Sequence, residues 1–312
     1  MADDVSTAVF LVALINGAIV AGMPLLFAAL GETVSQQAGL LDIGLEGMML
    51  LGAYAGFVVA ASTGSPWLGL LAAVAAGVAV SLLMVVFCVR MGRDQIVVGI
   101  AILLSMEGLT SLLHAAQFGE SYPRLDAVPA LAIPGLSRIP VLGPSVFSQP
   151  LIVYLGVALV VVLGWLLSRT GSGLSLRAAG WGPAALDRAG VDVLRIRTVA
   201  SLTTGALAGL GGGYLSVVAA GIFVPFMVGG LGFIAIVIAM LGRGRPAWVL
   251  AGALLFGLAL SVATALQLVG IQVPTDVVQM LPFVAVMVAL ALFARRSYLP
   301  AALGVPFDRE GR

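Results

Sequence analysis

The sequence predicts an all-α polytopic membrane protein. Hydrophobic residues make up 61% and charged residues 9% of the 312 residues, whereas soluble domains carry about 45–50% and about 25%. Apolar stretches of about 20 residues, the length that spans a bilayer, recur along the whole chain. Because a segment in lipid must satisfy its own backbone polar groups, we expect these stretches to be helices.

The composition also excludes several classes of enzyme and binding protein. All 15 basic residues are arginine, so a P-loop lysine or a Schiff-base lysine is impossible. The chain has one cysteine, Cys88, and one histidine, His114, which excludes an internal disulfide, a Cys/His zinc site and paired haem ligation. We therefore expect no metal and no cofactor. The net charge of +1 forms no basic stripe, so we do not expect nucleic acid as a partner.

Charged or Pro/Gly-rich borders divide the chain into nine predicted spans. They cover residues 5–30, 43–61, 67–89, 95–118, 151–168, 198–222, 226–241, 247–269 and 277–294. Asp3 and Asp4 precede the first stretch, where a signal peptide would carry positive charge. We therefore expect this stretch to be retained as a span.

Arginine residues indicate the orientation, because cytoplasmic connections collect them. They follow the third, fifth, seventh and ninth predicted spans, at Arg90, Arg93, Arg169, Arg177, Arg188, Arg195, Arg197, Arg243, Arg245, Arg295, Arg296, Arg309 and Arg312. On the other side, Glu120 and Asp126 balance Arg124 and Arg138. The N-terminus is therefore predicted outside and the C-terminal tail, residues 295–312, inside a multi-pass protein of the cell (inner) membrane.

Two parts of the chain, residues 5–118 and 198–294, resemble each other at an offset of roughly 180 residues. The shared landmarks are Gly44-Leu, Pro66-Trp and Asp94 in the first copy and Gly230-Leu, Pro246-Ala-Trp and Asp276 in the second. With the span 151–168 between them, the copies would enter the membrane from opposite sides, as in the inverted-topology repeats of transport proteins. Helices rich in Gly, Ala and Leu can also look alike by composition alone.

Polar residues interrupt the apolar pattern between the first two predicted spans, at Glu32, Gln36, Gln37, Asp42 and Glu46. A lipid-facing helix could not tolerate them, so we expect a broken helix near the midplane that lines a substrate pathway or is buried in protein. The i, i+4 spacing of Asp42 and Glu46 would place both carboxylates on one helical face, where they could bind a polyhydroxylated ligand or cap backbone groups. Alternatively, Glu46 only ties helices together.

Glu107 is a sixth pathway candidate, and it lies seven residues before His114 in the fourth predicted span. The two side chains therefore share a helical face. Such a pair could relay protons. In the alternative, His114 lies near the outer interface and Glu107 meets a neighbouring helix.

Small residues mark a helix-packing face in the sixth predicted span. They are Gly205, Gly209, Gly211, Gly212 and Gly213. After this span, Pro225, Met227, Gly229 and Gly230 break the chain at the position that mirrors the first break in the repeat.

The longest inside segment covers residues 169–197, and residues 180–190 within it are predicted to form one short helix. Pro183 suits the first turn of this helix and Gly190 its end. The arginines around it could contact anionic lipid headgroups, or the helix could be gripped by a cytoplasmic motor. These arginines are Arg177, Arg188, Arg195 and Arg197.

The polar segment also carries a family resemblance. The stretch Gly31-Glu-Thr-Val-Ser-Gln-Gln-Ala-Gly-Leu-Leu-Asp-Ile-Gly-Leu-Glu-Gly47-Met-Met-Leu-Leu-Gly-Ala resembles the signature of ABC-importer permeases of the branched-chain amino acid/ribose/nucleoside class, nearest to the nucleoside or simple-sugar branch. Further matches are Gln95-Ile-Val-Val-Gly99, Ile139-Pro-Val-Leu-Gly143, Gly182-Pro183 and Ser201-Leu-Thr-Thr-Gly205. Asp42 stands where the nucleoside branch has Asn and ribose-type relatives have Asp, so the choice between sugar and nucleoside stays open.

The resemblance implies a permease subunit that forms the translocation pathway and leaves ATP hydrolysis to a separate ATPase. Its expected partners are that cytoplasmic ATPase, a second permease subunit of a different chain, an extracytoplasmic substrate-binding lipoprotein and membrane lipid. It further implies that residues 180–190 are the coupling helix that docks on the ATPase. The residues assigned to this coupling are Arg177, Gly180, Trp181, Pro183, Ala184, Ala185, Asp187, Arg188 and Gly190.

A different class of transporter stays open from the residues alone. In an ion-coupled secondary transporter, the carboxylates of Asp42, Glu46 and Glu107 would form the ion site.

Overall fold

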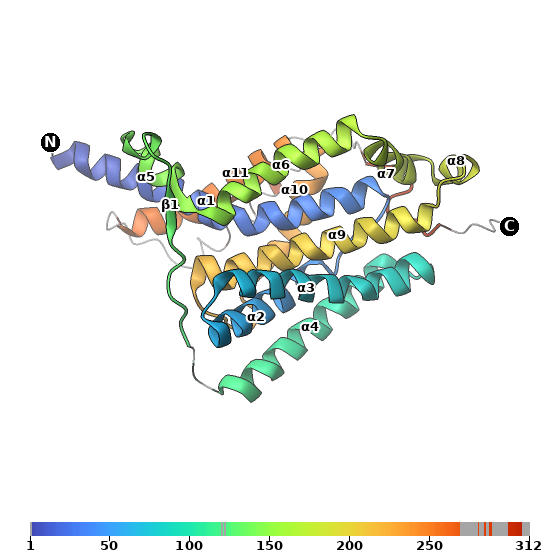
Figure 1. The fold of residues 1–312 in the computed structure, drawn as a ribbon, viewed down its shortest axis with the longest axis horizontal. Coiled ribbons are helices and arrows are strands. Elements are labelled where there is room, and N and C mark those ends of the chain that lie inside the picture. The colour runs from blue at the N-terminus through green and yellow to red at the C-terminus, as the bar shows by residue number, and fades with distance from the viewer. Residues whose placement is uncertain are drawn as a thin grey trace.

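The computed structural model describes residues 2–119, 121, 123–268, 280, 284, 287, 288 and 299–307. Its long helices lie roughly along one direction and form a single elongated bundle, with the N-terminus at one end (Figure 1). The predicted all-α polytopic class is confirmed. In the described part of the chain the only sheet is a two-stranded one, β1 (Ala130–Ala132) paired antiparallel with β2 (Ser148–Pro150).

Six helices among the described residues are long and apolar enough to cross a membrane. They are α1 (Ala2–Gln37), α2 (Leu45–Thr63), α3 (Pro66–Met84) with its π-helical continuation Val85–Arg90, α4 (Gln95–Phe118), α6 (Leu151–Arg169) and α9 (Val193–Gly213) with its π-helical continuation Tyr214–Ala220. These helices correspond to the first six predicted spans.

The remaining helices include α11, which has 23 residues, and several shorter ones. They are the 3₁₀ turn Leu136–Arg138, α5 (Leu142–Val146), α7 (Gly171–Trp181), α8 (Pro183–Arg188), α10 (Leu231–Gly242) and α11 (Pro246–Leu268). The seventh predicted span, residues 226–241, differs from the structure because residues 225–230 form turns. The 12 residues of α10 reach about 18 Å, well short of a bilayer core. The eighth predicted span is α11, and the ninth, residues 277–294, lies mostly outside the described residues.

Local side chains explain where several helices begin and end. Asp94 caps α4 by accepting hydrogen bonds from the backbone N–H groups of Ile96 and Val97 at 2.8 and 3.0 Å, and Asp192 caps α9 in the same way. Proline occupies the first turn of α3 and α8, where its missing N–H costs nothing. Gly64 ends α2 in the left-handed conformation (φ 68°) that glycine adopts without strain.

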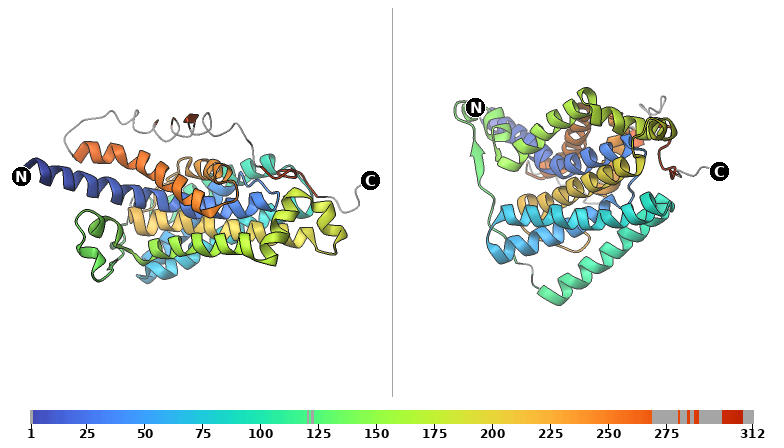
Figure 2. Two further views of the ribbon diagram at one scale, coloured as in Figure 1. Left: turned by 90° about the horizontal axis from the view of Figure 1, so that it is seen from above. Right: turned by 45° about the vertical axis from the view of Figure 1, so that its right-hand side comes forward.

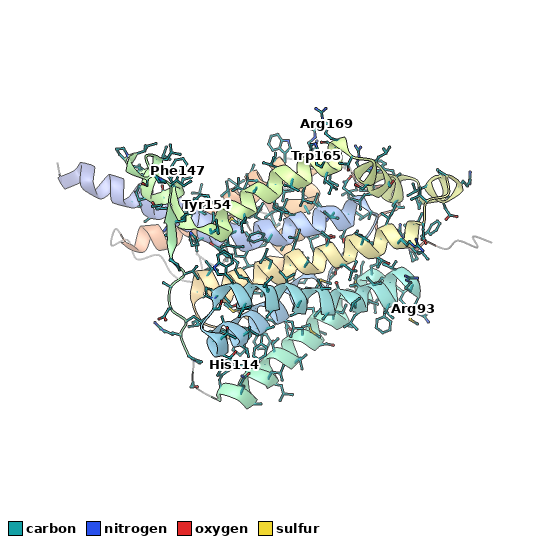
Figure 3. The ribbon with its side chains drawn as sticks, in the orientation of Figure 1. Arg93, His114, Phe147, Tyr154, Trp165 and Arg169 are labelled. Atoms are coloured by element: carbon teal, nitrogen blue, oxygen red, sulfur yellow. The ribbon has the colours of Figure 1, made fainter. Side chains whose placement is uncertain are left out.

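The two ends of the bundle differ in composition. Figure 3 shows Arg93 and Arg169 toward one end and Phe147, Tyr154 and His114 toward the other. The end that carries the N-terminus is covered by β1, β2 and α5 (Figure 1). The helices α7 and α8, with Arg177 and Arg188, lie at the arginine-rich end. This arrangement agrees with the alternation of charge from which the orientation was predicted.

The centre of the bundle is the second half of α1, which packs against α9, α10 and α11 (Figures 1 and 2). From Leu25 to Leu30 every side chain is 0–1% exposed. An apolar helix is also stable against lipid, so it is this burial, and not the apolar composition, that places the second half of α1 inside the bundle.

Two helix crossings in the bundle repeat each other. A Cβ added to Gly77 of α3 would meet the carbonyl oxygen of Gly205 and lie 2.8 Å from Cα of Gly209 in α9. A Cβ added to Gly257 of α11 would meet the carbonyl oxygen of Ala18 and lie 2.8 Å from Cα of Gly22 in α1. Gly77 and Gly257 are 180 residues apart, and Gly209 and Gly22 are 187 apart. Both crossings need glycine where two backbones touch, and the inverted repeat stays a prediction.

The crossing of α3 and α9 leads to a stability prediction. We expect Gly77→Ala to destabilise the protein by about 1–3 kcal/mol, since the new methyl group meets backbone and the helices must separate. The control is Gly164→Ala in α6, where an added Cβ meets nothing within 4 Å and alanine should be neutral or stabilise by up to about 1 kcal/mol. Thermal unfolding in detergent compares the two variants. Equal melting temperatures would contradict the close crossing.

Candidate functional site

The chain breaks between α1 and α2. α1 ends at Gln37, and residues 38–44 turn before α2 begins at Leu45. Gly39 has a positive φ of 83°, and Gly44 is the N-cap of α2. Because α2 starts after Asp42, the expectation that Asp42 and Glu46 share one helical face is wrong. The two carboxylates belong to different clusters.

The first cluster is buried and polar. The Gln36 side-chain amide donates to Glu32 Oε1 at 3.0 Å, and the Asp42 backbone N–H donates to the same oxygen at 3.4 Å. The Leu41 backbone N–H donates to Oε1 of Gln95, at the start of α4, at 2.7 Å. The turn after α1 therefore replaces missing helical hydrogen bonds with side-chain acceptors. We call Glu32, Gln36, Asp42 and Gln95 the inner polar cluster.

Three atoms of the inner polar cluster have capacity left for a ligand or water. Within the described part of the chain, Glu32 Oε2, Asp42 Oδ1 and Gln95 Nε2 are buried without a hydrogen-bond partner. The two carboxylate oxygens can accept hydrogen bonds from hydroxyl or amine groups, and the Gln95 amide nitrogen can donate one.

A second break lies between α9 and α10. The π-helical end of α9 stops at Gly221 (φ 65°), and the chain then turns through Phe226, Gly229 and Gly230, all with positive φ, before α10 begins. The Gly230 backbone N–H donates to Glu46 Oε1 at 2.6 Å. The N-terminus of α10 thus meets the first turn of α2, where the positive ends of both helix dipoles favour a carboxylate.

The contact between α2 and α10 joins positions that are equivalent in the predicted repeat. Glu46 is the third residue from Gly44, and Gly232 is the third from Gly230. A Cβ added to Gly232 would lie 2.6 Å from Cβ of Glu46. In an inverted repeat two equivalent residues touch at the axis that relates the copies, so the predicted repeat would place Glu46 and Gly232 at that axis.

Glu107 belongs with Glu46 rather than with His114. It is half-buried on α4 and within electrostatic range of Glu46, whose second oxygen, Oε2, is buried without a hydrogen-bond partner in the described part of the chain. His114 is buried near the C-terminal end of α4. The centroid of its ring lies 5.4 Å from that of Phe118 and 5.6 Å from that of Phe223. These neighbours favour the packing interpretation of His114 over a proton relay.

Gln37 lies apart from the other predicted pathway residues. A Cβ added to Gly244, between the arginines that follow α10, would lie 2.5 Å from its side-chain nitrogen. Gln37 therefore connects the end of α1 with the arginine-rich connection. Of the six predicted pathway residues, the structure gathers Glu32, Gln36 and Asp42 in the inner polar cluster and pairs Glu46 with Glu107.

The predicted coupling helix at residues 180–190 is two helices in the structure. Gly180 and Trp181 end α7, and Gly182 separates them from α8, which begins at Pro183. Gly190 follows α8 with φ 83°. The single helix is interrupted because Gly182 is extended and Pro183 cannot donate to the preceding turn. Of the residues assigned to coupling, Pro183 and Asp187 are half-buried, Gly180 is buried, and the others are exposed: Arg177, Trp181, Ala184, Ala185, Arg188 and Gly190.

The predicted packing glycines all lie against neighbouring helices. An added Cβ on Gly205 or Gly209 would meet α3, one on Gly211 would meet the carbonyl oxygen of Pro24 in α1, and one on Gly212 would meet that of Met49 in α2. Gly213 faces the side chain of Ala73. This face lets α9 touch three helices at once.

Two residues near the first break were not singled out by the sequence. Gln95 looks like an ordinary helix-start residue, yet its side chain closes the turn at Leu41. Arg197 was grouped with the arginines expected at lipid headgroups, but it is only 2% exposed. The one signal for Arg197 was its position at the start of an apolar stretch, where a lipid-facing arginine is costly.

Comparison with known proteins extends over almost the whole chain. The family described as "Branched-chain amino acid transport system / permease component" matches residues 14–291. The guanosine ABC transporter permease protein NupQ of Bacillus subtilis is 33% identical over 96% of this chain and 97% of its own length. The nucleoside ABC transporter permease protein NupC of Lactococcus lactis is 31% identical over 92% and 94%. A putative glucose ABC transporter permease protein, TsgC13 of Haloferax volcanii, is 35% identical over 80% and 76%.

The contact at Glu46 leads to a second prediction. Glu46→Gln keeps an oxygen that accepts from the Gly230 N–H, whereas Glu46→Leu leaves that N–H without an acceptor. We expect the leucine variant to be less stable than the glutamine variant by about 1–3 kcal/mol. Thermal unfolding of both variants in detergent measures the difference. A leucine variant as stable as the glutamine variant would show that the hydrogen bond does not hold α10 against α2.

Proposed function

The chain belongs to the family of branched-chain amino acid transport system permease components, an ABC transporter permease family, and on this premise we propose that it carries nucleosides or simple sugars into the cell. It is a multi-pass protein of the inner membrane. Nucleoside permeases match nearly its full length, and this match is the observation that carries the proposal.

The two broken helices support a pathway role. Turns within the depth of a membrane are tolerated only where they are enclosed by protein or line a polar cavity. The inner polar cluster and the pair of Glu46 and Glu107 provide carboxylate and amide groups that can bind hydroxyl groups. Ribose and hexoses both present such hydroxyls, so this chemistry suits both cargo classes. Glu32, Gln36, Asp42, Glu46 and Glu107 are the proposed pathway residues.

The proposed energy source is a separate ATPase that docks on α7 and α8. Both helices lie at the arginine-rich end, and α8 presents a small apolar face, with Ala184 and Ala185 exposed. Trp181 is 44% exposed beside them, and a half-exposed tryptophan is a common anchor in protein interfaces. ATP hydrolysis therefore belongs to the partner chain, and this chain acts as the permease subunit.

The complete transporter contains further partners. A second permease subunit, a different chain, shares the pathway, and an extracytoplasmic binding lipoprotein delivers the cargo to the end of the bundle that carries the N-terminus. Membrane lipid surrounds the apolar outer faces.

Uptake measurements test the proposal. Cells or vesicles that contain this chain, with and without the ATPase, the second permease and the binding protein, are given labelled nucleosides and pentoses, with ATP depleted or the proton gradient collapsed. Uptake that requires all partners and ATP is the expected result. Uptake by the chain alone that stops with the proton gradient would overturn the proposal and identify a secondary transporter.

The docking surface leads to a third prediction. We expect Ala185→Arg to leave the protein inserted but to reduce copurification of the ATPase and uptake about tenfold or more, because a bulky charge replaces a methyl group in the interface. The control is Ser172→Arg, at an exposed position near the start of α7. Affinity purification followed by quantification of the ATPase measures docking. Undiminished copurification with Ala185→Arg would place the docking surface elsewhere.

A further inference from the structure

Part of the C-terminal region returns to the first break. The Ala302 backbone N–H donates to the carbonyl oxygen of Gly180, at the end of α7, at 2.9 Å. The Gly304 N–H donates to the carbonyl oxygen of Gly39, in the break after α1, at 3.1 Å. Residues 302–305, which we call the C-terminal strap, therefore bridge α7 and the break by backbone hydrogen bonds.

A buried arginine holds the other side of the same junction. Arg197 Nε donates to the carbonyl oxygen of Ala38 at 3.1 Å, and Nη1 donates to that of Val305 at 2.9 Å. In the described part of the chain, its Nη2 is buried without a hydrogen-bond partner. A guanidinium that is 2% exposed and bound to two carbonyl groups fixes their separation, because its planar donors have a rigid geometry.

The end of α7 also touches the break directly. A Cβ added to Gly180 would meet the carbonyl oxygen of Gln37 and lie 3.0 Å from the backbone nitrogen of Gly39. Only a residue without a side chain permits this approach, and Gly39 also needs its positive φ of 83°. The end of α7 therefore lies against the backbone of the break that carries Asp42, with no flexible side chain between them.

The strap is anchored beyond Arg197 by a small apolar cluster. Phe307 packs against Ala179 of α7, Leu186 of α8 and Val193 of α9. This cluster is separate from the main core. The helices α7 and α8, the strap and the start of α9 therefore form one packed unit at the arginine-rich end of the bundle.

We propose that Arg197 and the C-terminal strap link α7 and α8 to the break after α1, so that a displacement of these helices by the ATPase moves the inner polar cluster. This inference rests on the proposed function. Arg197 is a positioning residue, since it acts by holding the carbonyl groups of Ala38 and Val305. Without it, α7 and α8 would still bind the ATPase, but their movement would reach Asp42 less completely.

The first test replaces the buried arginine and a neighbouring exposed one. Arg197 binds the carbonyl groups of both Ala38 and Val305. The shorter side chain of Arg197→Gln has one amide donor group and cannot hold both. Its control, Arg195→Gln, removes an arginine whose side chain is 83% exposed and forms an ion pair with Asp192 at 3.4 Å. The complete transporter is reconstituted with its ATPase, second permease and binding protein, and both uptake of labelled nucleosides and pentoses and ATP hydrolysis are measured. We expect Arg197→Gln to keep ATP hydrolysis while transport per ATP falls about tenfold or more.

A second pair of variants addresses the strap without touching a buried charge. Ala302→Pro removes the N–H that donates to Gly180. Its control, Ala301→Pro, occupies the second position of the turn closed by the hydrogen bond from Leu303 to Pro300, where proline is favoured. We expect only Ala302→Pro to lower transport per ATP.

The outcomes separate the inference from the proposed function. If uptake by the unmodified transporter does not need the ATPase, the proposed function fails. If uptake by the unmodified transporter needs the ATPase, two results overturn the inference. In the first, Arg197→Gln and Ala302→Pro transport like their controls. In the second, transport and ATP hydrolysis fall in equal proportion in these variants. If Arg197→Gln does not assemble, Ala302→Pro decides: unchanged transport per ATP overturns the inference, and a selective loss supports it.

Discussion

The hydrogen bond from the Gly230 backbone to the Glu46 carboxylate joins the two places where this bundle departs from continuous helices. A broken helix within a membrane leaves backbone groups that lipid cannot satisfy, so the protein itself must satisfy them. Here the Glu46 side chain, just after the first break, accepts the hydrogen bond from the Gly230 backbone N–H at the second break. The close approach also requires glycine at position 232, because any side chain there would collide with Glu46. The position of α10, and with it the shape of the interior, depends on this contact.

Around this contact, two helix crossings resemble each other. The crossings of α3 with α9 and of α11 with α1 use glycine at matching positions, and both bring backbones into contact. Such crossings place the polar turns in the interior, since helices with larger side chains at these points would stand further apart. The inner polar cluster and the pair of Glu46 and Glu107 can therefore be enclosed by protein, which lowers the cost of carboxylates at this depth.

The arginine-rich end is built differently from the rest of the bundle. There α7, α8, the C-terminal strap and the start of α9 form a packed unit with its own apolar cluster. Backbone contacts at Gly180 and Gly39, together with the buried Arg197, connect this unit to the break after α1. In a permease whose energy comes from another chain, the surface that receives the force and the turns that respond to it must be mechanically connected.

The sequence by itself determined the membrane class, the first six spans, the charge difference between the two ends and the location of both breaks. These features follow from hydropathy, arginine placement and Gly/Pro content, which act over a few neighbouring residues. Only the tertiary structure decided that Asp42 joins Glu32 while Glu46 joins Gly230, that the predicted coupling helix is divided at Gly182, and that Arg197 is buried. Glu46 and Gly230 are 184 residues apart in the sequence, and which distant backbone meets a given side chain depends on how the helices pack, which no local pattern records.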